Sequence, residues 1–410
     1  MNLKYPNMKK IAIIGTVGVP GRYGGFETLA HHLVLNLNKE FKLSVYNSKL
    51  TYGKEERPKF WNGARIFYLP FNANGWQSII YDIISIIHAV FYADVLVVLG
   101  VSGGLIFPFV RLFTNKKIIV NIDGLEWRRN KWNKWVKKFL RFSEKLAVRF
   151  SHADITDNAV IKKYTALIYK SLSHEIAYGA DHAKEQFITS KMKKLYPFIV
   201  EPYAFKVCRI EPENNVHLIL ETFSELPYRT LAFVGNWEGS EYGRELKKKY
   251  ATCKNILLLD PIYDQEHLDT LRSNCYLYIH GHSAGGTNPS LVEAMILGLP
   301  IVAFNVAFNR ASTHNQALFF RNKSDLKNII QSKSTQDYYE VGKKLKKVAL
   351  QEYTWATITR KYANIIYAFD YDYTKSNVLP ELASMKREFL IENEVAHLEY
   401  SLLFYQNGDS

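Results

Sequence analysis

The stretch from Cys275 to Phe304 contains residue types whose order could do chemistry. It reads CYLYIHGHSAGGTNPSLVEAMILGLPIVAF, which is an apolar run, a glycine-rich polar loop, a short helical pattern and a second apolar run. Asn288 suits the N-cap of that helix, Pro289 suits its first position, and Glu293 falls in its second turn. Amides at a helix start bind anions, and a carboxylate one turn further can accept hydrogen bonds from sugar hydroxyls. The combination predicts a nucleotide-sugar site, although glycines in such loops also serve only to turn the chain.

A second glycine-rich loop follows the first expected strand, Ile11–Ile14. It reads GTVGVPGRYGGFE, and Gly24 and Gly25 begin a helix that continues to Leu37. The earlier glycines do not have the G-x-G-x-x-G spacing of dinucleotide-binding proteins, which disfavours a nicotinamide cofactor. A glycine pair at a helix start lets phosphate oxygens approach the backbone amides. Arg22 beside it could add positive charge, or it could be a solvated loop residue.

Two charged residues stand at the ends of expected strands. Asp123 follows the strand Lys117–Asn121, and Arg209 ends the strand expected over Phe198–Arg209. Ligands of α/β proteins bind at the carboxyl ends of the parallel strands. Asp123 could bind a sugar hydroxyl or help to take a proton from an acceptor, or it could cap the loop that follows. We predict Asp123 and Arg209 as catalytic residues.

The segment from Trp127 to Arg149 is strongly basic and amphipathic. It contains nine lysines and arginines against one acid, Glu144, while tryptophans and other apolar residues recur at helical spacing. A helix of this composition is typical of a membrane interface. The alternative is a helix that packs on its own domain and has a solvated basic face. The residues predicted to contact a membrane or an acceptor are Arg128, Arg129, Trp132, Lys134, Trp135 and Lys138.

Length and composition favour a protein of two domains. The chain has 410 residues, 47% of them hydrophobic, and a formal net charge of +14. Short apolar runs alternate with helical patterns in both halves, which predicts α/β domains with parallel sheets. We expect a cytosolic protein, because the three cysteines are scattered and the N-terminal residues are polar. We expect no membrane span, because Asp82 and Asp94 interrupt the longest apolar region. The positive charge favours anionic partners, such as phosphorylated substrates, anionic lipid or nucleic acid.

The central stretch resembles the donor-site signature of the family-four glycosyltransferases of GT-B fold, in which seven residues separate two glutamates. Glu293 matches the second glutamate, whereas Gly285 stands at the place of the first. The phrase GHSAGGTNPSLVEAM is similar to a bacterial subgroup typified by rhamnosyltransferases that build surface polysaccharides. The resemblance covers about residues 10–369 and implies two Rossmann-like domains that face each other across a cleft. It implies an acceptor-side domain at residues 1–185 and a nucleotide-sugar-binding domain at residues 186–352. Residues 353–410 would form helices that return to the first domain, followed by an unassigned tail with a helical pattern over Pro380–Tyr400.

The resemblance also implies roles for single residues. Glu293 would hold the ribose of the donor nucleotide. Arg209 would grip the donor diphosphate together with a lysine five residues on, but Asn214 stands in the place of that lysine. Lys206 or Arg22 could substitute for it. The residues predicted to bind the donor are Gly24, Gly25, Arg209, His282, Gly286, Thr287, Asn288, Pro289, Ser290 and Glu293.

The predicted reaction is a retaining transfer of L-rhamnose from dTDP-L-rhamnose to a lipid-diphosphate-linked saccharide. It would take place at the inner face of the cytoplasmic membrane. Asp123, at the place where many family members carry a histidine that touches the donor sugar, would assist it. We expect no cofactor and no metal, because no acidic metal motif is evident. Two alternatives stay open. The first is a catalytically silent GT-B scaffold or nucleotide-sugar-binding protein, because Gly285 and Asn214 stand where charged residues are expected. The second is a nucleic-acid-binding protein, because the net charge of the chain is strongly positive.

Overall fold

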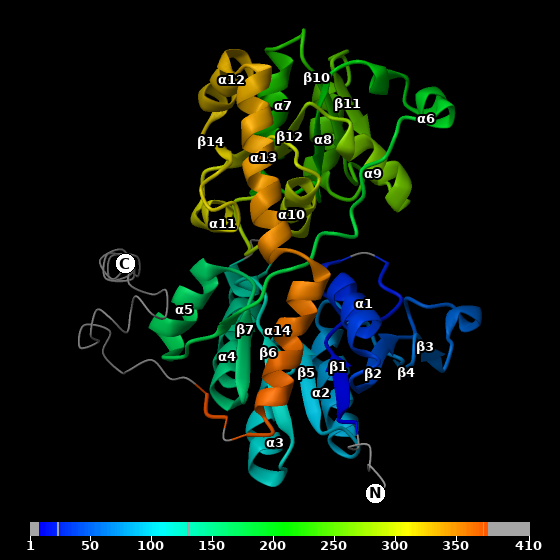
Figure 1. Cartoon of the computed structure of the whole chain (residues 1–410), viewed down its shortest axis with the longest axis vertical. Helices are drawn as coiled ribbons and strands as arrows, with labels where there is room; N and C mark the ends of the chain where they lie inside the picture. Colours follow the sequence, from blue (N-terminus) through cyan, green and yellow to red (C-terminus); the bar gives the residue numbers. More distant parts are fainter. Residues whose placement is uncertain (1–7, 23, 129–131, 372, 376–410) are drawn as a thin grey trace, which may run out of the picture. The chain divides into compact units, whose positions relative to one another are not determined.

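The structure, a computed structural model, describes residues 8–22, 24–128, 132–371 and 373–375. It has an α/β fold with two sheets whose strands are almost all parallel (Figure 1). The chain divides into two compact units. Unit 1 takes the described residues of Met1–Ile176 and Thr359–Ser410, and unit 2 takes Ala177–Ile358. The prediction of an α/β protein with two Rossmann-like parts is confirmed.

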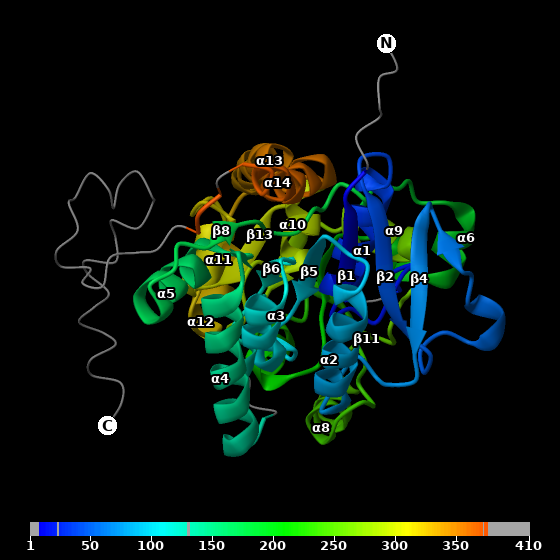
Figure 2. The same ribbon diagram turned by 90° about the horizontal axis from the view of Figure 1, so that it is seen from below.

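Unit 1 is built on a sheet with the strand order β3-β4-β2-β1-β5-β6-β7-β8, in which the β3–β4 pair is antiparallel. Its central strands are continuous apolar runs and are buried on both faces, as parallel strands between helices require. Figure 2 shows helices α2, α3 and α4 on one side of this sheet and α14 on the other. The strands are β1 (Lys10–Ile14), β2 (Lys42–Ser48), β3 (Phe60–Trp61), β4 (Ala64–Leu69), β5 (Val95–Leu99), β6 (Lys117–Asn121), β7 (Ala153–Thr156) and β8 (His174–Glu175). The helices are α1 (Gly25–Leu37), α2 (Gln77–Val90), α3 (Phe107–Phe113), α4 (Lys134–Phe150), α5 (Ala159–Tyr169) and α14 (Trp355–Ala368), which begins in unit 2.

Unit 2 contains a parallel sheet with the strand order β11-β10-β9-β12-β13-β14. Helices α10 and α13 approach so closely that a Cβ added at Gly342 would lie 2.2 Å from the carbonyl oxygen of Gly298, so the contact requires a glycine. The strands are β9 (Tyr203–Val207), β10 (Thr230–Val234), β11 (Ile256–Leu259), β12 (Leu277–His280), β13 (Ile301–Phe304) and β14 (Leu318–Phe320). The helices are α6 (Ser190–Leu195), α7 (Val216–Ser224), α8 (Glu241–Tyr250), α9 (Gln265–Ser273), α10 (Pro289–Ile296), α11 (Ala307–Ser312), α12 (Lys323–Ser332) and α13 (Thr335–Glu352).

The basic segment differs from its prediction as one continuous helix. Helix α4 begins only at Lys134, where Asn133 caps it by accepting a hydrogen bond from a backbone N–H of the first turn. Trp132 lies before the helix, and its indole N–H donates to Glu126 Oε1 at 3.1 Å. This contact and the side-chain cap set the helix start, so η3 (Glu126–Arg128) is a separate 3-10 turn.

Other elements were also placed differently from the sequence patterns. The strand expected over Phe198–Arg209 holds a 3-10 turn, η4 (Pro197–Val200), and the shorter strand β9, because Pro202 has no N–H for a sheet. The patterns do not indicate α3, α8, α9, α11 or α12. The helical pattern over Pro380–Tyr400 lies outside the described residues. Within the part of the chain that the structure describes, no helix has both the length and the apolar content needed to cross a membrane.

Candidate functional site

The start of helix α10 positions the residue that the sequence marks most clearly, Glu293. Asn288 caps the helix, and its Oδ1 accepts hydrogen bonds from Ser290 N–H at 3.1 Å and from Ser290 Oγ–H at 2.7 Å. Pro289 occupies the first helical position, where no N–H is needed. The Ser290 amide is therefore used by the cap of its own helix.

The carboxylate of Glu293 is held from two sides within unit 2. Arg272 Nη1, on a side chain that is 1% exposed, lies 2.7 Å from Glu293 Oε2. His182 Nε2 lies 3.2 Å from Glu293 Oε1. Trp355 Nε1, which can only donate, lies 3.0 Å from His182 Nδ1. Nδ1 is therefore the acceptor, and Nε2 carries the proton that His182 donates to Glu293.

This arrangement keeps Glu293 ionised. Burial raises the pKa of Glu293, but the charge of Arg272 and the hydrogen bond from His182 outweigh burial and hold the pKa below its usual value. Asp269 Oδ1 lies 3.6 Å from Arg272 Nη1, so the guanidinium lies between two carboxylates. A carboxylate offers about four lone-pair sites, and the Glu293 side chain is 14% exposed. Glu293 can therefore accept further hydrogen bonds from a ligand at its exposed edge.

The glycine-rich loop before α10 is tied to its surroundings by side chains. The ring of His282 stacks on the buried ring of His280, with centroids 4.4 Å apart, and Thr287 Oγ1 lies 3.0 Å from Ser312 Oγ. Gly285 has a φ of 118°, and a Cβ added there would meet no atom within 4 Å. The position that corresponds to the family's first glutamate thus has open space around it. Its positive φ favours glycine. Of the predicted donor residues in this loop and helix start, Thr287 is buried, and His282, Gly286, Asn288, Pro289 and Ser290 are half-buried.

Arg209 follows β9, and its side chain is 54% exposed. Its Nε lies 3.9 Å from Glu211 Oε2, at the limit of an ion pair. Asn214 is buried, and its Nδ2 donates a hydrogen bond to the carbonyl oxygen of Arg209 at 2.6 Å. The residue in the place of the family's lysine therefore shapes the turn that presents Arg209.

The two cations considered as substitutes for that lysine are engaged elsewhere. Lys206 is fully buried, its Nζ lies 5.5 Å from the centre of the Phe233 ring, and burial lowers its pKa. Arg22, in unit 1, pairs with Glu56 at 2.6 Å and lies over the ring of Tyr52. Burial excludes Lys206 as the substitute, which corrects that expectation, and Arg22 stays a prediction.

In unit 1, the loop after β1 and the start of α1 bring a further carboxyl group to the sheet edge. Gly24 has a φ of 126°, and a Cβ added there would lie 2.0 Å from Glu27 Oε2; Gly25 follows as the first residue of α1. Glu27 Oε1 accepts a hydrogen bond from Val17 N–H at 3.0 Å. Burial raises the pKa of Glu27, and the charge of Asp123 raises it further. The sequence-based list omits Glu27, although its place in the first turn after a glycine pair is a signal that could have found it.

Asp123 is fixed by the end of strand β6. It has a φ of 59°, and its N–H donates to Asn121 Oδ1 at 2.9 Å, while Asn121 Nδ2 donates to Tyr362 OH at 2.8 Å. Asn133, and not Asp123, caps the basic helix. Within the described ranges, no group of three or more His, Cys, Asp or Glu could hold a metal ion.

The residues predicted to contact a membrane or an acceptor are described in part. Trp135 is 79% exposed, and Lys138 Nζ lies 5.4 Å from the centre of its ring. Lys134, the first residue of α4, is also exposed. Arg128 ends the 3-10 turn η3, and Arg129 lies outside the described residues. Helix α4 therefore presents tryptophan and cations together on its exposed side.

Two family models match this chain. Residues 8–181 match the family described as "Domain of unknown function (DUF1972)", and residues 189–333 match "Glycosyl transferases group 1". Residues 189–333 are therefore similar to group 1 glycosyltransferase domains. This domain contains Arg209, Arg272 and Glu293, and it begins just after His182.

Several solved structures share the fold. Sucrose-phosphate synthase from Thermosynechococcus elongatus is 14% identical, with 88% of this chain and 99% of that chain covered and a TM-score of 0.73. HepE from Anabaena, solved in complex with UDP-glucose, is 15% identical, with 88% and 100% covered and a TM-score of 0.68. The GT-B fold expected from the sequence is confirmed, and together with the group 1 domain it supports a glycosyltransferase.

One curated relative matches a short segment. Protein CapJ from Staphylococcus aureus is 33% identical over 89 residues, which is 22% of this chain and 22% of CapJ. The match thus spans about a fifth of CapJ's length.

Proposed function

We propose that this glycosyltransferase transfers L-rhamnose from dTDP-L-rhamnose, with retention, to a lipid-diphosphate-linked saccharide in surface polysaccharide biosynthesis. The observation that carries the donor part is the ionised Glu293 carboxylate, which Arg272 fixes and which stays 14% exposed within the segment that matches group 1 glycosyltransferases. HepE shares the fold and was solved with UDP-glucose, which supports a nucleotide-sugar donor. The choice of rhamnose rests on the similarity of GHSAGGTNPSLVEAM to the rhamnosyltransferase subgroup.

The ribose of the donor would hydrogen-bond to Glu293. The guanidinium of Arg272 offsets the charge of this carboxylate, so an anionic nucleotide meets less repulsion than it would from an unpaired glutamate. His182 holds the other oxygen, which fixes the orientation of the carboxylate before the ligand arrives. Glu293 is in this way a preorganised acceptor for hydroxyl groups.

The leaving group would be a nucleoside diphosphate whose charge increases as the sugar departs. The half-exposed guanidinium of Arg209 and the backbone amides at Gly24 and Gly25 are the proposed groups that offset this charge, without a metal ion. The departing phosphate would take the proton of the acceptor hydroxyl, and Asp123 would assist. In this mechanism Arg209 contributes mainly to turnover.

The acceptor would be presented by a membrane. Helix α4 carries exposed Trp135 beside Lys134 and Lys138, a combination that favours the surface of an anionic bilayer. This supports a protein that associates peripherally with the inner face of the cytoplasmic membrane. The short match to CapJ is compatible with a role in a surface polysaccharide.

The test is a thermal-shift series on the full chain with dTDP, UDP, GDP and the corresponding nucleotide sugars. We expect dTDP to raise the melting temperature with increasing concentration, as a ligand of the folded state must. Glu293→Gln is expected to weaken this response at least tenfold, whereas Glu245→Gln, a change at an exposed glutamate of α8, is expected to leave it unchanged. A chain that none of these nucleotides stabilises would contradict the proposal.

A catalytically silent GT-B scaffold is the second candidate. It is favoured by the buried Asn214, which holds the Arg209 carbonyl where relatives are expected to carry a phosphate-binding lysine. Release of dTDP from dTDP-L-rhamnose in the presence of membranes distinguishes the two. Nucleotide binding without such release from any common nucleotide sugar would favour the scaffold.

A further inference from the structure

The edge of unit 1 where β5 and β6 begin carries unusually exposed apolar side chains. Phe91, just after α2, is 84% exposed, and Leu112 and Phe113, at the end of α3, are 75% and 74% exposed. The two strands that follow these helices are neighbours, with Val95 paired to Lys117. The three apolar side chains therefore lie at the ends of neighbouring helices, at the same edge of the sheet.

Helix α2 continues this apolar surface. Its sequence QSIIYDIISIIHAV contains no lysine, arginine or glutamate, and its one aspartate, Asp82, is buried. Ile80 and Ile87 are 38% and 46% exposed, so the outward side of the helix is aliphatic. A soluble surface rarely gathers so many apolar side chains unless a partner covers them.

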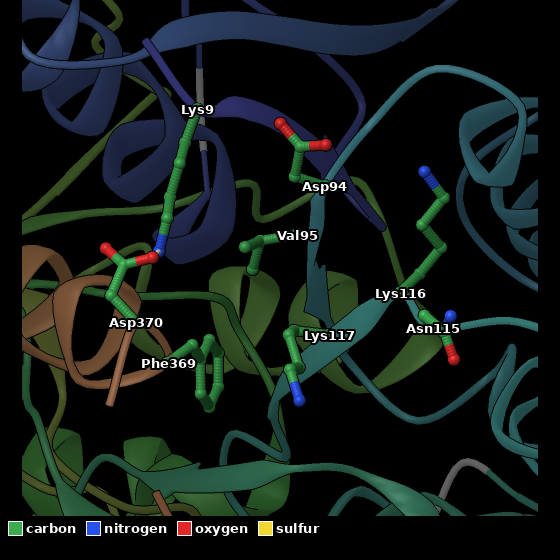
Figure 3. A pocket seen from close by; sticks show the side chains of 8 residues that line it. All are labelled: Lys9, Asp94, Val95, Asn115, Lys116, Lys117, Phe369 and Asp370. Atoms are coloured by element: carbon green, nitrogen blue, oxygen red, sulfur yellow. Dashed lines mark ion pairs between the residues drawn. The ribbon is translucent and has the colours of Figure 1, made fainter. Parts of the chain in front are cut away.

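A hollow of about 290 Å³ opens at the same edge (Figure 3). Lys9, Lys116, Lys117 and Phe369 are among the residues that line it. Lys9 pairs with Asp370 at 2.7 Å, and Figure 3 shows the two side chains directed toward each other. Lys116 and Lys117 make no ion pair with any described residue, so their charge is available to an anion.

Positive charge at this edge also acts on a nearby half-buried histidine, His152. Burial, together with the charges of Arg111, Lys117 and Lys375, lowers the pKa of His152 to about 3. Ile118 N–H donates to His152 Nδ1 at 3.0 Å, which agrees with a neutral ring. Lys375 is offset by Asp154 at 2.6 Å, but Arg111, like Lys116 and Lys117, pairs with no carboxylate in the described part of the chain. The edge thus has an excess of cations next to exposed apolar residues.

We propose that this edge binds an anionic lipid bilayer. The amino-edge patch consists of Phe91, Arg111, Leu112, Phe113, Lys116 and Lys117. Its three apolar side chains enter the interfacial region, and Arg111, Lys116 and Lys117 attract anionic lipid headgroups. The inference rests on the proposed function in one respect, because a lipid-linked acceptor requires the enzyme to work at a membrane.

The composition of the patch favours a bilayer over other occupants. A second copy of the chain in a two-fold pair would place the same unpaired cations opposite each other. A nucleic acid would use the cations but would leave Leu112 and the isoleucines of α2 exposed. Only a surface with both anionic groups and an apolar layer covers the whole patch. The exposed residues of α4 described above lie at the start of that helix, near the carboxyl ends of the strands. The amino-edge patch lies where the strands begin, so it is a separate contact.

The test is flotation of the full chain with phosphatidylcholine vesicles that contain or lack phosphatidylglycerol. For Lys116→Gln/Lys117→Gln we expect binding to anionic vesicles to fall about 25-fold, because each lysine contributes about fivefold. For Leu112→Ser/Phe113→Ser we expect a fall of about tenfold that added salt does not mask, because apolar insertion is not screened. The matched controls are Lys343→Gln/Lys344→Gln on α13 and Phe187→Ser, which change exposed residues of unit 2 and should leave binding unchanged.

Any outcome other than loss of vesicle binding in the patch variants alone overturns the proposal. Unchanged binding in both patch variants would exclude the patch, and an equal loss in the α13 lysine control would mean that only the total charge matters. Sedimentation velocity without lipid tests whether the patch instead binds a second copy of the chain. Loss of self-association in the patch variants would assign the patch to that contact. Urea unfolding confirms that the variants fold. The nucleotide thermal shift, measured in the same variants, should not change, so failure of the patch and failure of the glycosyltransferase proposal remain distinguishable.

Discussion

At the scale of single residues, Glu293 is both a candidate ligand group and a structural partner. Its carboxylate neutralises Arg272, whose side chain is 1% exposed. Removal of one partner of a buried ion pair leaves the other charge without compensation, and this costs more than the pair itself contributes. A loss of nucleotide binding in Glu293→Ala would therefore not by itself prove contact with the nucleotide.

Stability and binding can be separated at this position. We expect Glu293→Ala to lower the free energy of unfolding by about 3 kcal/mol, because buried Arg272 loses its 2.7 Å partner and keeps only Asp269 at 3.6 Å. Glu293→Gln keeps an oxygen that accepts a hydrogen bond, so it should cost less stability and still lose nucleotide affinity. Urea unfolding and a nucleotide titration on the same samples measure the two effects. Equal stability of the alanine variant and the unsubstituted chain would contradict the ion pair.

Glu27 should make stability depend on pH in the direction opposite to Glu293. Burial raises the pKa of Glu27 in the folded state, so the stability gained from its protonated form is present at low pH and is lost as the pH rises through that pKa. Glu27→Gln keeps the acceptor for Val17 N–H and removes the charge. We expect this variant to be more stable than the unsubstituted chain near neutral pH, with the difference shrinking toward about pH 4. Urea unfolding over this pH range measures it, and a difference that does not change with pH would contradict the assignment.

At the scale of elements, the start of α10 combines a helix cap with residues predicted to bind the donor. Asn288 Oδ1 accepts from the amide and from the hydroxyl of Ser290. The cap fixes the first turn, and Glu293 lies one turn further along the same helix. Loss of the cap should therefore disturb both the stability of the helix and the position of Glu293.

Substitutions at Asn288 test this coupling. Asn288→Ala should lower the free energy of unfolding by about 1 kcal/mol and weaken nucleotide binding, because the first turn loses its cap. Asn288→Ser restores a side-chain acceptor and should recover most of both properties. Urea unfolding and nucleotide titration are the measurements. If the serine variant regains stability but not affinity, Asn288 contacts the nucleotide directly.

At the scale of the whole molecule, the chain consists of two units with different surfaces. Unit 2 contains Glu293, Arg272 and His182, whereas unit 1 contains the basic helix α4 and the amino-edge patch. The nucleotide contact of Glu293 and the membrane contacts are thus proposed for different units. This division means that the two activities should respond to different substitutions.

Hydrogen exchange on the full chain tests this division. Saturation with dTDP should slow amide exchange mainly within Ala177–Ile358, with the strongest effect in the loop before α10 and in α10 itself. At about 100 times the dissociation constant the stabilisation should be about 2.7 kcal/mol. Anionic vesicles should instead slow exchange in α2 and α3 of unit 1. Protection by dTDP that appears only in unit 1 would contradict the placement of the donor site.

Much of the fold could be read from the sequence. Strand β6 has the predicted bounds, and β1 begins one residue before its prediction, because short apolar and β-branched runs between polar loops favour buried strands. Asn288, Pro289 and Gly298 mark the limits of α10, because capping depends on nearest neighbours in the chain. The sequence by itself therefore determined the local elements and the position of Glu293 on its helix.

Only the tertiary structure decided what that carboxylate contacts. Arg272 is one arginine among many in the sequence, and His182 lies 111 residues from Glu293, so no local pattern indicates that the three meet. The burial of Lys206 and the turn-forming role of Asn214 were hidden for the same reason. Periodicity and capping act over a few residues, whereas ion pairing and burial depend on which elements the fold brings together.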